Sequence, residues 1–293
     1  MALFLQAVLA GVTAGSIYAL VAIGVAVIFK VSRVLNLAQG EFVALGALAA
    51  YSLAMVLRLP LPLAFVIAVA GVSLLGILFE RMAIRPARNQ TVTVLLVITL
   101  GTSILLRGVA MVIWGKDPMS LPSFSGDQPI GFYGLFIMPQ HLWVLGGIAV
   151  TATALWFFFD RTMLGKAMMA AAENRAASQM IGIDVVAVNR LAFGLSAAVG
   201  AMAGILVAPI TYITYDGGTM VGLKGFVAAI IGVMGSIPGG IIGGLLLGVV
   251  EALAASYVSS LFKDATAFVI LIVVLLLRSG LDKRTTLSQG LGR

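Results

Sequence analysis

Cysteine is absent from this sequence, and histidine occurs once, as His141. Without cysteine the chain can hold no disulfide, thiolate metal site or cysteine nucleophile. One histidine excludes a metal cluster built from several imidazoles, and beside Trp143 we interpret it as a residue of the membrane interface. Charged residues are also scarce, at 10% of the 293 residues, where a soluble domain carries about 25%. Because 61% of the residues are hydrophobic, one soluble core is excluded and lipid is the expected solvent.

Sequence motifs of nucleotide-binding and catalytic sites are missing as well. The sequence has no Gly-x-x-x-x-Gly-Lys-Ser/Thr loop, so the chain alone is not expected to hydrolyse ATP. No pair of carboxylates and no Ser/His/Asp set supports a catalytic proposal. We therefore expect a protein that is not an enzyme and that binds no cofactor or metal itself.

The basic residues that give a formal net charge of +7 lie in a few short polar segments. This distribution follows the positive-inside rule, and no aromatic-basic stretch supports nucleic-acid binding. The segments at 80–90 and 160–189 and the tail are therefore predicted to be cytoplasmic. The segment 115–140 carries one basic residue and is predicted to be periplasmic, which also puts the N-terminus outside. The basic residues are Arg81, Arg85 and Arg88, then Arg161, Lys166, Arg175 and Arg190, then Arg278, Lys283, Arg284 and Arg293.

Apolar runs long enough to cross about 30 Å of hydrocarbon recur along the chain. They predict an all-α polytopic membrane protein, one domain over residues 1–293, with eight or nine transmembrane segments. The first run is interpreted as a retained helix rather than a cleaved signal. Parity requires two shorter helices, or a re-entrant pair, within 213–264, meeting at 235–240. The runs are 3–29, 35–57, 61–79, 91–114, 141–159, 191–212, 224–253 and 265–277.

Two polar or glycine-rich interruptions break these runs. The first, within 30–41, contains Asn36, Gln39, Gly40 and Glu41, and the second contains Gly235, Ser236, Pro238 and Gly239. Irregular backbone at membrane depth is tolerated where it is buried in protein or lines an aqueous cavity. A break in each half is typical of a substrate path between inverted repeats, so these eight residues are the substrate-path candidates. The other interpretation is a short interfacial loop at each place.

The 160–189 segment predicts a helix over 166–180 at the cytoplasmic face, because it is rich in alanine. Gly182 fits the C′ position that closes such a helix, and Asp184 fits the N-cap of the next span. A short helix bounded on both sides suits a rigid lever.

Several charges near membrane depth need partners. We expect Glu41 to pair with Lys30 or Arg33, and Arg107 to extend outward to the interface. Asp216 and Lys224 are expected to flank an outer loop, and Glu251 to cap a helix or face the pathway. Small residues four apart, as in Gly11/Gly15 and Gly244/Gly248, predict close helix packing in lipid.

Taken in order, the motifs of this chain resemble the branched-chain amino-acid ABC transporter permeases, the shorter of two paralogues. The resemblance covers nearly the whole chain. The matching stretches are Gly15-Ser16-Ile17-Tyr18-Ala19-Leu20, Asn36-Leu37-Ala38-Gln39-Gly40-Glu41, Glu80-Arg81, Arg85-Pro86-Ala87-Arg88, Gly165-Lys166-Ala167, Ala172-Glu173-Asn174, Ala176-Ala177, Gly182-Ile183, Gly235-Ser236-Ile237-Pro238-Gly239-Gly240 and Glu251-Ala252.

The resemblance implies an inverted-repeat ABC importer permease of the bacterial inner membrane that imports branched-chain or other hydrophobic amino acids. Its partners would be a second permease in a heterodimer, two ABC ATPases that hold ATP and magnesium, a periplasmic substrate-binding protein, and the bilayer. The cytoplasmic segment would couple to an ATPase through Lys166, Glu173, Asn174, Arg175, Ala176, Ala177, Gly182 and Ile183. The alternatives are ABC import of urea, short amides or other amino acids, and a secondary transporter.

Overall fold

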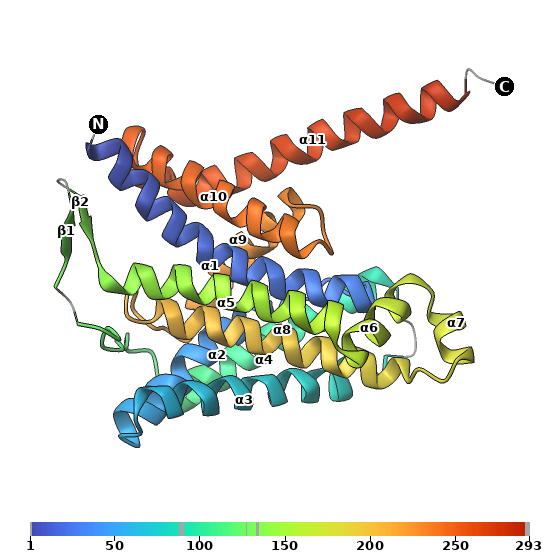
Figure 1. The fold of residues 1–293 in the computed structure, drawn as a ribbon, viewed down its shortest axis with the longest axis horizontal. Helices are drawn as coiled ribbons and strands as arrows, with labels where there is room; N and C mark the ends of the chain where they lie inside the picture. Colours follow the sequence, from blue (N-terminus) through green and yellow to red (C-terminus); the bar gives the residue numbers. More distant parts are fainter. Residues whose placement is uncertain (1, 88–90, 127, 133–134, 291–293) are drawn as a thin grey trace.

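The computed structural model describes residues 2–87, 91–126, 128–132 and 135–290, and it is a helical bundle (Figure 1). Two π-helical turns, Ser52–Val56 and Glu80–Ile84, extend α2 and α3, and a 3₁₀ turn, Ser260–Phe262, precedes α11. The helices are α1 (Ala2–Ser32), α2 (Gln39–Tyr51), α3 (Leu61–Phe79), α4 (Val92–Trp114), α5 (Pro139–Arg161), α6 (Met163–Glu173), α7 (Arg175–Met180), α8 (Val185–Val207), α9 (Gly217–Ile231), α10 (Ile237–Tyr257) and α11 (Lys263–Gly290).

Seven helices in the described part of the chain are long and apolar enough to cross a membrane: α1 to α5, α8 and α10. The shorter apolar helix α9 and the apolar first half of α11 bring the number of apolar helices to nine. The predicted all-α polytopic architecture is therefore confirmed, and the predicted count of eight or nine is approximate. A hairpin of two short strands, β1 (Ile130–Phe132) and β2 (Leu135–Ile137), was not predicted.

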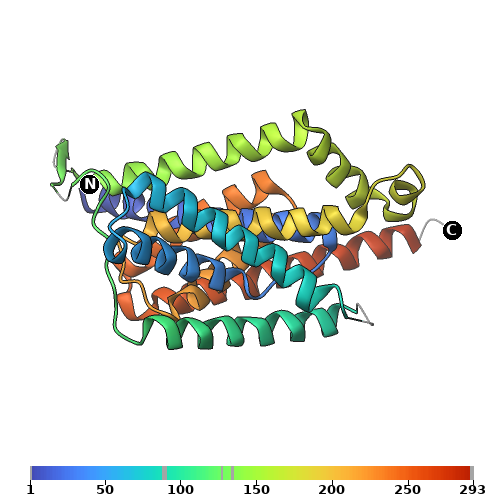
Figure 2. The same ribbon diagram turned by 90° about the horizontal axis from the view of Figure 1, so that it is seen from below.

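The helix ends divide between two ends of the molecule. Figure 1 shows the N-terminus and the β1–β2 hairpin at one end, and α6, α7 and the C-terminus at the other. An antiparallel pair of backbone hydrogen bonds between Met119 and Ile213, 2.9 and 2.8 Å long, joins the segment after α4 to the connection before α9. Figure 2 shows α4 along one edge and α5 along the opposite edge, with the other helices between them.

Helix α1 runs through the centre and packs closely on α10 through glycines. A Cβ placed on Gly15 would lie 2.8 Å from the Gly244 carbonyl oxygen, and one on Gly11 would lie 2.7 Å from the Val249 Cα. Such distances leave no room for a side chain, so the backbones themselves are in contact. The small-residue pairs at Gly11/Gly15 and Gly244/Gly248 therefore do what their spacing predicts.

Replacing Gly15 with valine is expected to lower the unfolding free energy of the purified chain by about 1–3 kcal/mol, because overpacking forces helix α1 away from α10. Gly101→Val in α4 is the matched control, since a Cβ at Gly101 has nothing within 4 Å. Unfolding curves in detergent measure both variants. Equal losses at Gly15 and Gly101 would contradict close packing as the cause.

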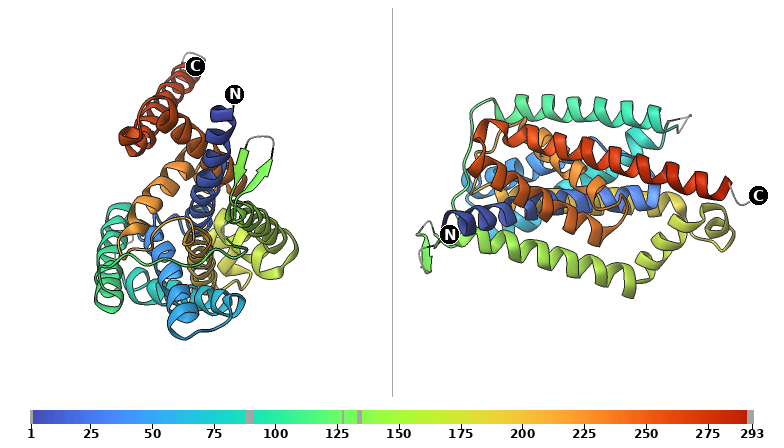
Figure 3. Two further views of the ribbon diagram at one scale, coloured as in Figure 1. Left: turned by 90° about the vertical axis from the view of Figure 1, so that its left-hand side faces the viewer. Right: turned by 90° about the horizontal axis from the view of Figure 1, so that it is seen from above.

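Helices α9 and α10 form a hairpin, as predicted for 213–264. Their connecting turn points toward the end that carries α6 and α7, and α10 returns to the opposite end, from which α11 starts (Figure 3). The turn needs two left-handed residues, Val233 at φ 68° and Gly235 at φ 85°. The bounds of the sixth helix also differ from the predicted run, 191–212: α8 begins at Val185 and ends at Val207. The loop predicted at 80–90 begins with a helical turn, Glu80–Ile84.

Candidate substrate path and coupling surface

The first interruption is a buried connection between α1 and α2. Asn36 and Gln39 are each 1% exposed, and Glu41 is 2% exposed. The Asn36 Oδ1 accepts a hydrogen bond of 3.0 Å from the Ala38 backbone N–H, which turns the chain into α2. The interruption therefore lies inside the helical bundle and is not a loop at its surface, in agreement with the rule that irregular backbone at this depth is buried in protein.

Gln39 joins three helices at this point. Its Nε2 donates to the Ser196 carbonyl oxygen of α8 at 3.1 Å. The Ser196 hydroxyl lies 2.7 Å from both the Gln39 Oε1 and the Gly24 carbonyl oxygen of α1. Beside it, Gly40 packs directly on Gly218 and Gly222 of α9. The start of α2 is thus held between α1, α8 and α9.

Glu41 is the acceptor of a polar cluster that joins α2, α4 and α9. Its Oε1 accepts hydrogen bonds from the Ser103 hydroxyl at 2.9 Å and the Thr219 hydroxyl at 3.0 Å. The Arg107 Nη1 in turn donates to the Thr219 hydroxyl at 3.3 Å. The expected pairing of Glu41 with Lys30 or Arg33 is therefore wrong, and Arg107 turns inward toward this cluster. The two hydroxyls, one of them bonded to Arg107, stabilise the buried carboxylate.

A second charged cluster joins α1, α9 and α10. The Lys224 Nζ lies 2.7 Å from the Glu251 Oε1 and 2.7 Å from the Asp264 Oδ1, and the Tyr18 hydroxyl donates to Glu251 at 3.2 Å. Lys224 is 5% exposed and Glu251 1%. Lys224 thus lies within α9 and not beside an outer loop as expected. The apolar residues around Lys224 in the sequence do not indicate that its partner is Glu251, 27 residues away.

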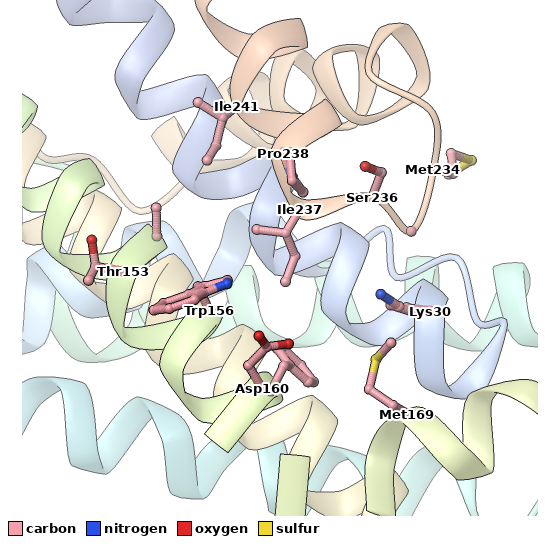
Figure 4. A pocket seen from close by; sticks show the side chains of 13 residues that line it. Lys30, Thr153, Trp156, Asp160, Met169, Met234, Ser236, Ile237, Pro238 and Ile241 are labelled. Atoms are coloured by element: carbon pink, nitrogen blue, oxygen red, sulfur yellow. The ribbon is translucent and has the colours of Figure 1, made fainter. Parts of the chain in front are cut away.

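The second interruption, 235–240, lines a cleft of about 700 Å³ between α1, α5 and α10. The Ser236 hydroxyl caps α10 by accepting from the Gly239 N–H at 3.1 Å, and Pro238 occupies the first turn. Gly239 packs against the Gly232 carbonyl oxygen. The lining includes Gly235, Ser236 and Pro238 but none of residues 36–41. The two predicted groups therefore do not share this cleft (Figure 4).

The predicted helix over 166–180 is two helices, α6 and α7, so that prediction is wrong in its continuity. Asn174 separates them with an extended backbone (φ −147°, ψ 103°) and caps α7 by accepting from the Ala177 N–H at 3.0 Å. Asparagine favours this capping geometry over a helix interior. The predicted ends are confirmed: Gly182 has φ 87°, and the Asp184 carboxylate accepts from the N–H groups of Val186 and Ala187.

The predicted coupling residues differ in their accessibility. Lys166, Glu173, Ala176 and Ala177 are exposed. Arg175 is exposed as well but reaches back to the bundle, with its Nη2 3.3 Å from the Val31 carbonyl oxygen at the end of α1 and 3.4 Å from the Asn189 Oδ1 of α8. Ile183 is partly buried, and its N–H donates to the Ser178 carbonyl oxygen at 2.9 Å.

Large apolar side chains surround these residues at the same end. Met163, Met180 and Ile181 are 84%, 86% and 75% exposed. The residues predicted from the sequence include one large apolar side chain, Ile183, but not these three exposed ones. Leu164, Ala176 and Ala177 are exposed as well, and we call these exposed apolar residues of α6 and α7, with Ile181 after α7, the coupling surface. In the part of the chain that the structure describes, no group of three or more histidine, aspartate or glutamate side chains is placed to hold a metal ion.

Comparison with known proteins gives concordant matches. The family model described as branched-chain amino acid transport system / permease component matches residues 7–277. The chain is 35% identical over 292 residues to the high-affinity branched-chain amino acid transport system permease protein LivH of Escherichia coli K12, covering 93% of each chain. It is 33% identical to the permease protein BraD of Pseudomonas aeruginosa, covering 94% of each. A solved structure, PsaBC from Streptococcus pneumoniae in complex with Fab, superposes with a TM-score of 0.47 at 15% identity, covering 92% of this chain and 90% of that one.

Proposed function

Because this chain belongs to the branched-chain amino acid transport system permease family, we propose that it is a transmembrane subunit of an ATP-driven importer for branched-chain or other hydrophobic amino acids. Its partners are then a second permease, two ATPase subunits that hold ATP and magnesium, and a periplasmic binding protein that delivers the amino acid. The membrane is the bacterial inner membrane, with 115–140 in the periplasm and 160–189 in the cytoplasm.

The observation that carries this proposal is the coupling surface. Met180 and Ile181 are exposed at the end of α7, which also presents two exposed alanines small enough for a partner to approach closely. Exposed apolar patches of this kind mark protein–protein contacts. The surface lies at the end of the molecule where α11 ends, and basic residues gather in the segments predicted to face the cytoplasm (Figure 1). An ATPase docking from the cytoplasm accounts for both features.

The route from the coupling surface to the membrane runs through Arg175. Its hydrogen bonds to Val31 and Asn189 attach α7 to the inner ends of α1 and α8. Gln39 binds these same two helices at depth through Ser196 and Gly24. A displacement of α7 therefore shifts the elements that hold the start of α2, and with them the Glu41 cluster. Coupled transport requires helices of this kind, whose positions depend on the nucleotide bound at a distant site.

Reconstitution tests the proposal. The purified chain alone should neither hydrolyse ATP nor accumulate leucine in proteoliposomes. With its second permease and ATPases, ATP hydrolysis should rise when leucine-loaded binding protein is added, and uptake should follow ATP. Binding protein loaded with urea or a short amide is the comparison that identifies the cargo. Uptake by the chain alone, driven by an ion gradient, would instead establish a secondary transporter.

A further inference from the structure

The cleft of about 700 Å³ has a mixed lining that the transport proposal does not use. Its polar side chains are Lys30 at the end of α1, Thr153 and Asp160 on α5, and Ser236 before α10. Its apolar walls come from Trp156, Met169, Met234, Ile237 and Ile241. Figure 4 shows the Lys30 amine and the Asp160 carboxylate on opposite sides of the open space.

Neither charge has a partner in the described part of the chain. The ion pairs involve other residues, and no hydrogen bond is made by the side chain of Lys30 or of Asp160. Trp156 lies on the same side of the space as Asp160 (Figure 4). An ammonium placed there meets both a carboxylate and an indole face, which each attract cations. An anion near Lys30 meets the ammonium of this lysine and the positive N-terminal end of α10.

Large exposed apolar side chains flank the cleft on two of its helices. Trp156 and Phe157 on α5 are each 57% exposed, and Ile242 and Leu246 on α10 are 59% and 54% exposed. Tryptophan and lysine at helix ends are the residues that lie at the level of lipid headgroups. From this level, Thr153 and Ile241 continue the cleft between α5 and α10 toward the middle of the bundle (Figure 4).

We propose that this cleft binds a phospholipid with a primary-ammonium headgroup, of the phosphatidylethanolamine type. The phosphate lies at Lys30 and the N-terminus of α10, the ammonium at Asp160 and Trp156, and one acyl chain between α5 and α10. A free amino acid offers the same two charges, but the exposed apolar side chains of α5 and α10 beside the cleft and a volume of about 700 Å³ favour a ligand that also carries a long apolar chain.

Native mass spectrometry of the purified full chain tests this proposal without any transport measurement. The protein is incubated with phosphatidylethanolamine and phosphatidylglycerol that carry identical acyl chains. About fivefold preferential retention of phosphatidylethanolamine is expected, because phosphatidylglycerol has no ammonium for Asp160. Excess leucine should displace none of it; displacement would reassign the cleft to the free amino acid.

Charge-removing variants locate the bound lipid. Asp160→Asn should bring the preference close to one, and Lys30→Gln should lower the retention of both lipids, because both carry the phosphate. Lys116→Gln and Asp117→Asn, exposed residues at the opposite end, are the matched controls and should change neither the preference nor the retention. A photoreactive acyl chain on phosphatidylethanolamine should label α5 or α10 in the unaltered chain. An unchanged preference in Asp160→Asn, unchanged retention of both lipids in Lys30→Gln, or labelling that avoids both helices overturns the proposal.

Discussion

Ala177→Trp is expected to abolish amino-acid uptake and ATPase co-purification while leaving the amount of chain in the membrane unchanged. Ala177 is exposed, so the larger side chain costs the permease itself little. On the coupling surface, however, it occupies the space that an ATPase must enter, and overpacked interfaces fail to close. Uptake in cells and affinity co-purification of the ATPases measure the two effects.

The matched control is Ala154→Trp, another exposed alanine, which lies on α5 away from the coupling surface. It should leave ATPase binding intact. Charge reversal at Glu173 should weaken docking less than Ala177→Trp does, because an exposed ion pair contributes about 0–1 kcal/mol. Normal uptake in Ala177→Trp would refute docking at α7 and leave 80–88 as the remaining cytoplasmic candidate.

The same segment reports its side of the membrane. Since the chain has no cysteine, Gln179→Cys on α7 and Gln128→Cys near the β hairpin are single labelling sites in exposed positions. An impermeant maleimide added to intact cells should label residue 128 and not residue 179. The reverse pattern would place α7 outside, beyond the reach of any ATPase.

Lys224→Met should lower the unfolding free energy by about 3–5 kcal/mol, because it removes the buried cation of Glu251 and leaves only the half-exposed Lys263 near that carboxylate. The two charged atoms lie 2.7 Å apart in a site where Glu251 is 1% exposed. Denaturant unfolding of the purified chain measures the loss, and a low membrane yield would accompany it.

The control for Lys224→Met is Lys263→Met, since the Lys263 Nζ also approaches Glu251, at 3.6 Å, but its side chain is 49% exposed. That change should cost less than about 1 kcal/mol. The double variant Lys224→Met with Glu251→Gln should recover much of the loss, because it removes both charges and keeps an acceptor for the Tyr18 hydroxyl. A double variant as unstable as Lys224→Met would show that the lost charge pairing is not the cause.

The sequence predicts the positions of the helices well, but it does not predict which residues contact one another between helices. The apolar run at 61–79 coincides with α3, Leu61–Phe79, because hydrocarbon thickness sets the length of a span directly. Glu41, by contrast, bonds Thr219, 178 residues later in the chain. No local periodicity encodes such a contact, so the prediction selected the nearest cations in sequence.

Local rules also succeeded and failed for identifiable reasons within one segment. Gly182 and Asp184 were predicted correctly because each acts on the residues beside it. The break at Asn174 was not predicted, because the helix propensity summed over this segment is high with its many alanines and one asparagine lowers it little. Of the cleft, only the part lined by Gly235, Ser236 and Pro238 was indicated by the sequence, since α1 and α5 reach it from distant parts of the chain.

The central position of α1 has a consequence for biosynthesis. It leaves the ribosome before the other helices described here, yet 83% of its apolar stretch is buried, against 17% for α4. The partners that bury it include α8, α9 and α10, which are synthesised much later, and Gly15 meets Gly244 across more than two hundred residues. Contacts so distant in sequence form slowly. The nascent chain must therefore hold α1 in the bilayer with its glycine face uncovered until α10 has been synthesised, and a ribosome stalled after α8 would leave that face open to any other small-residue helix nearby.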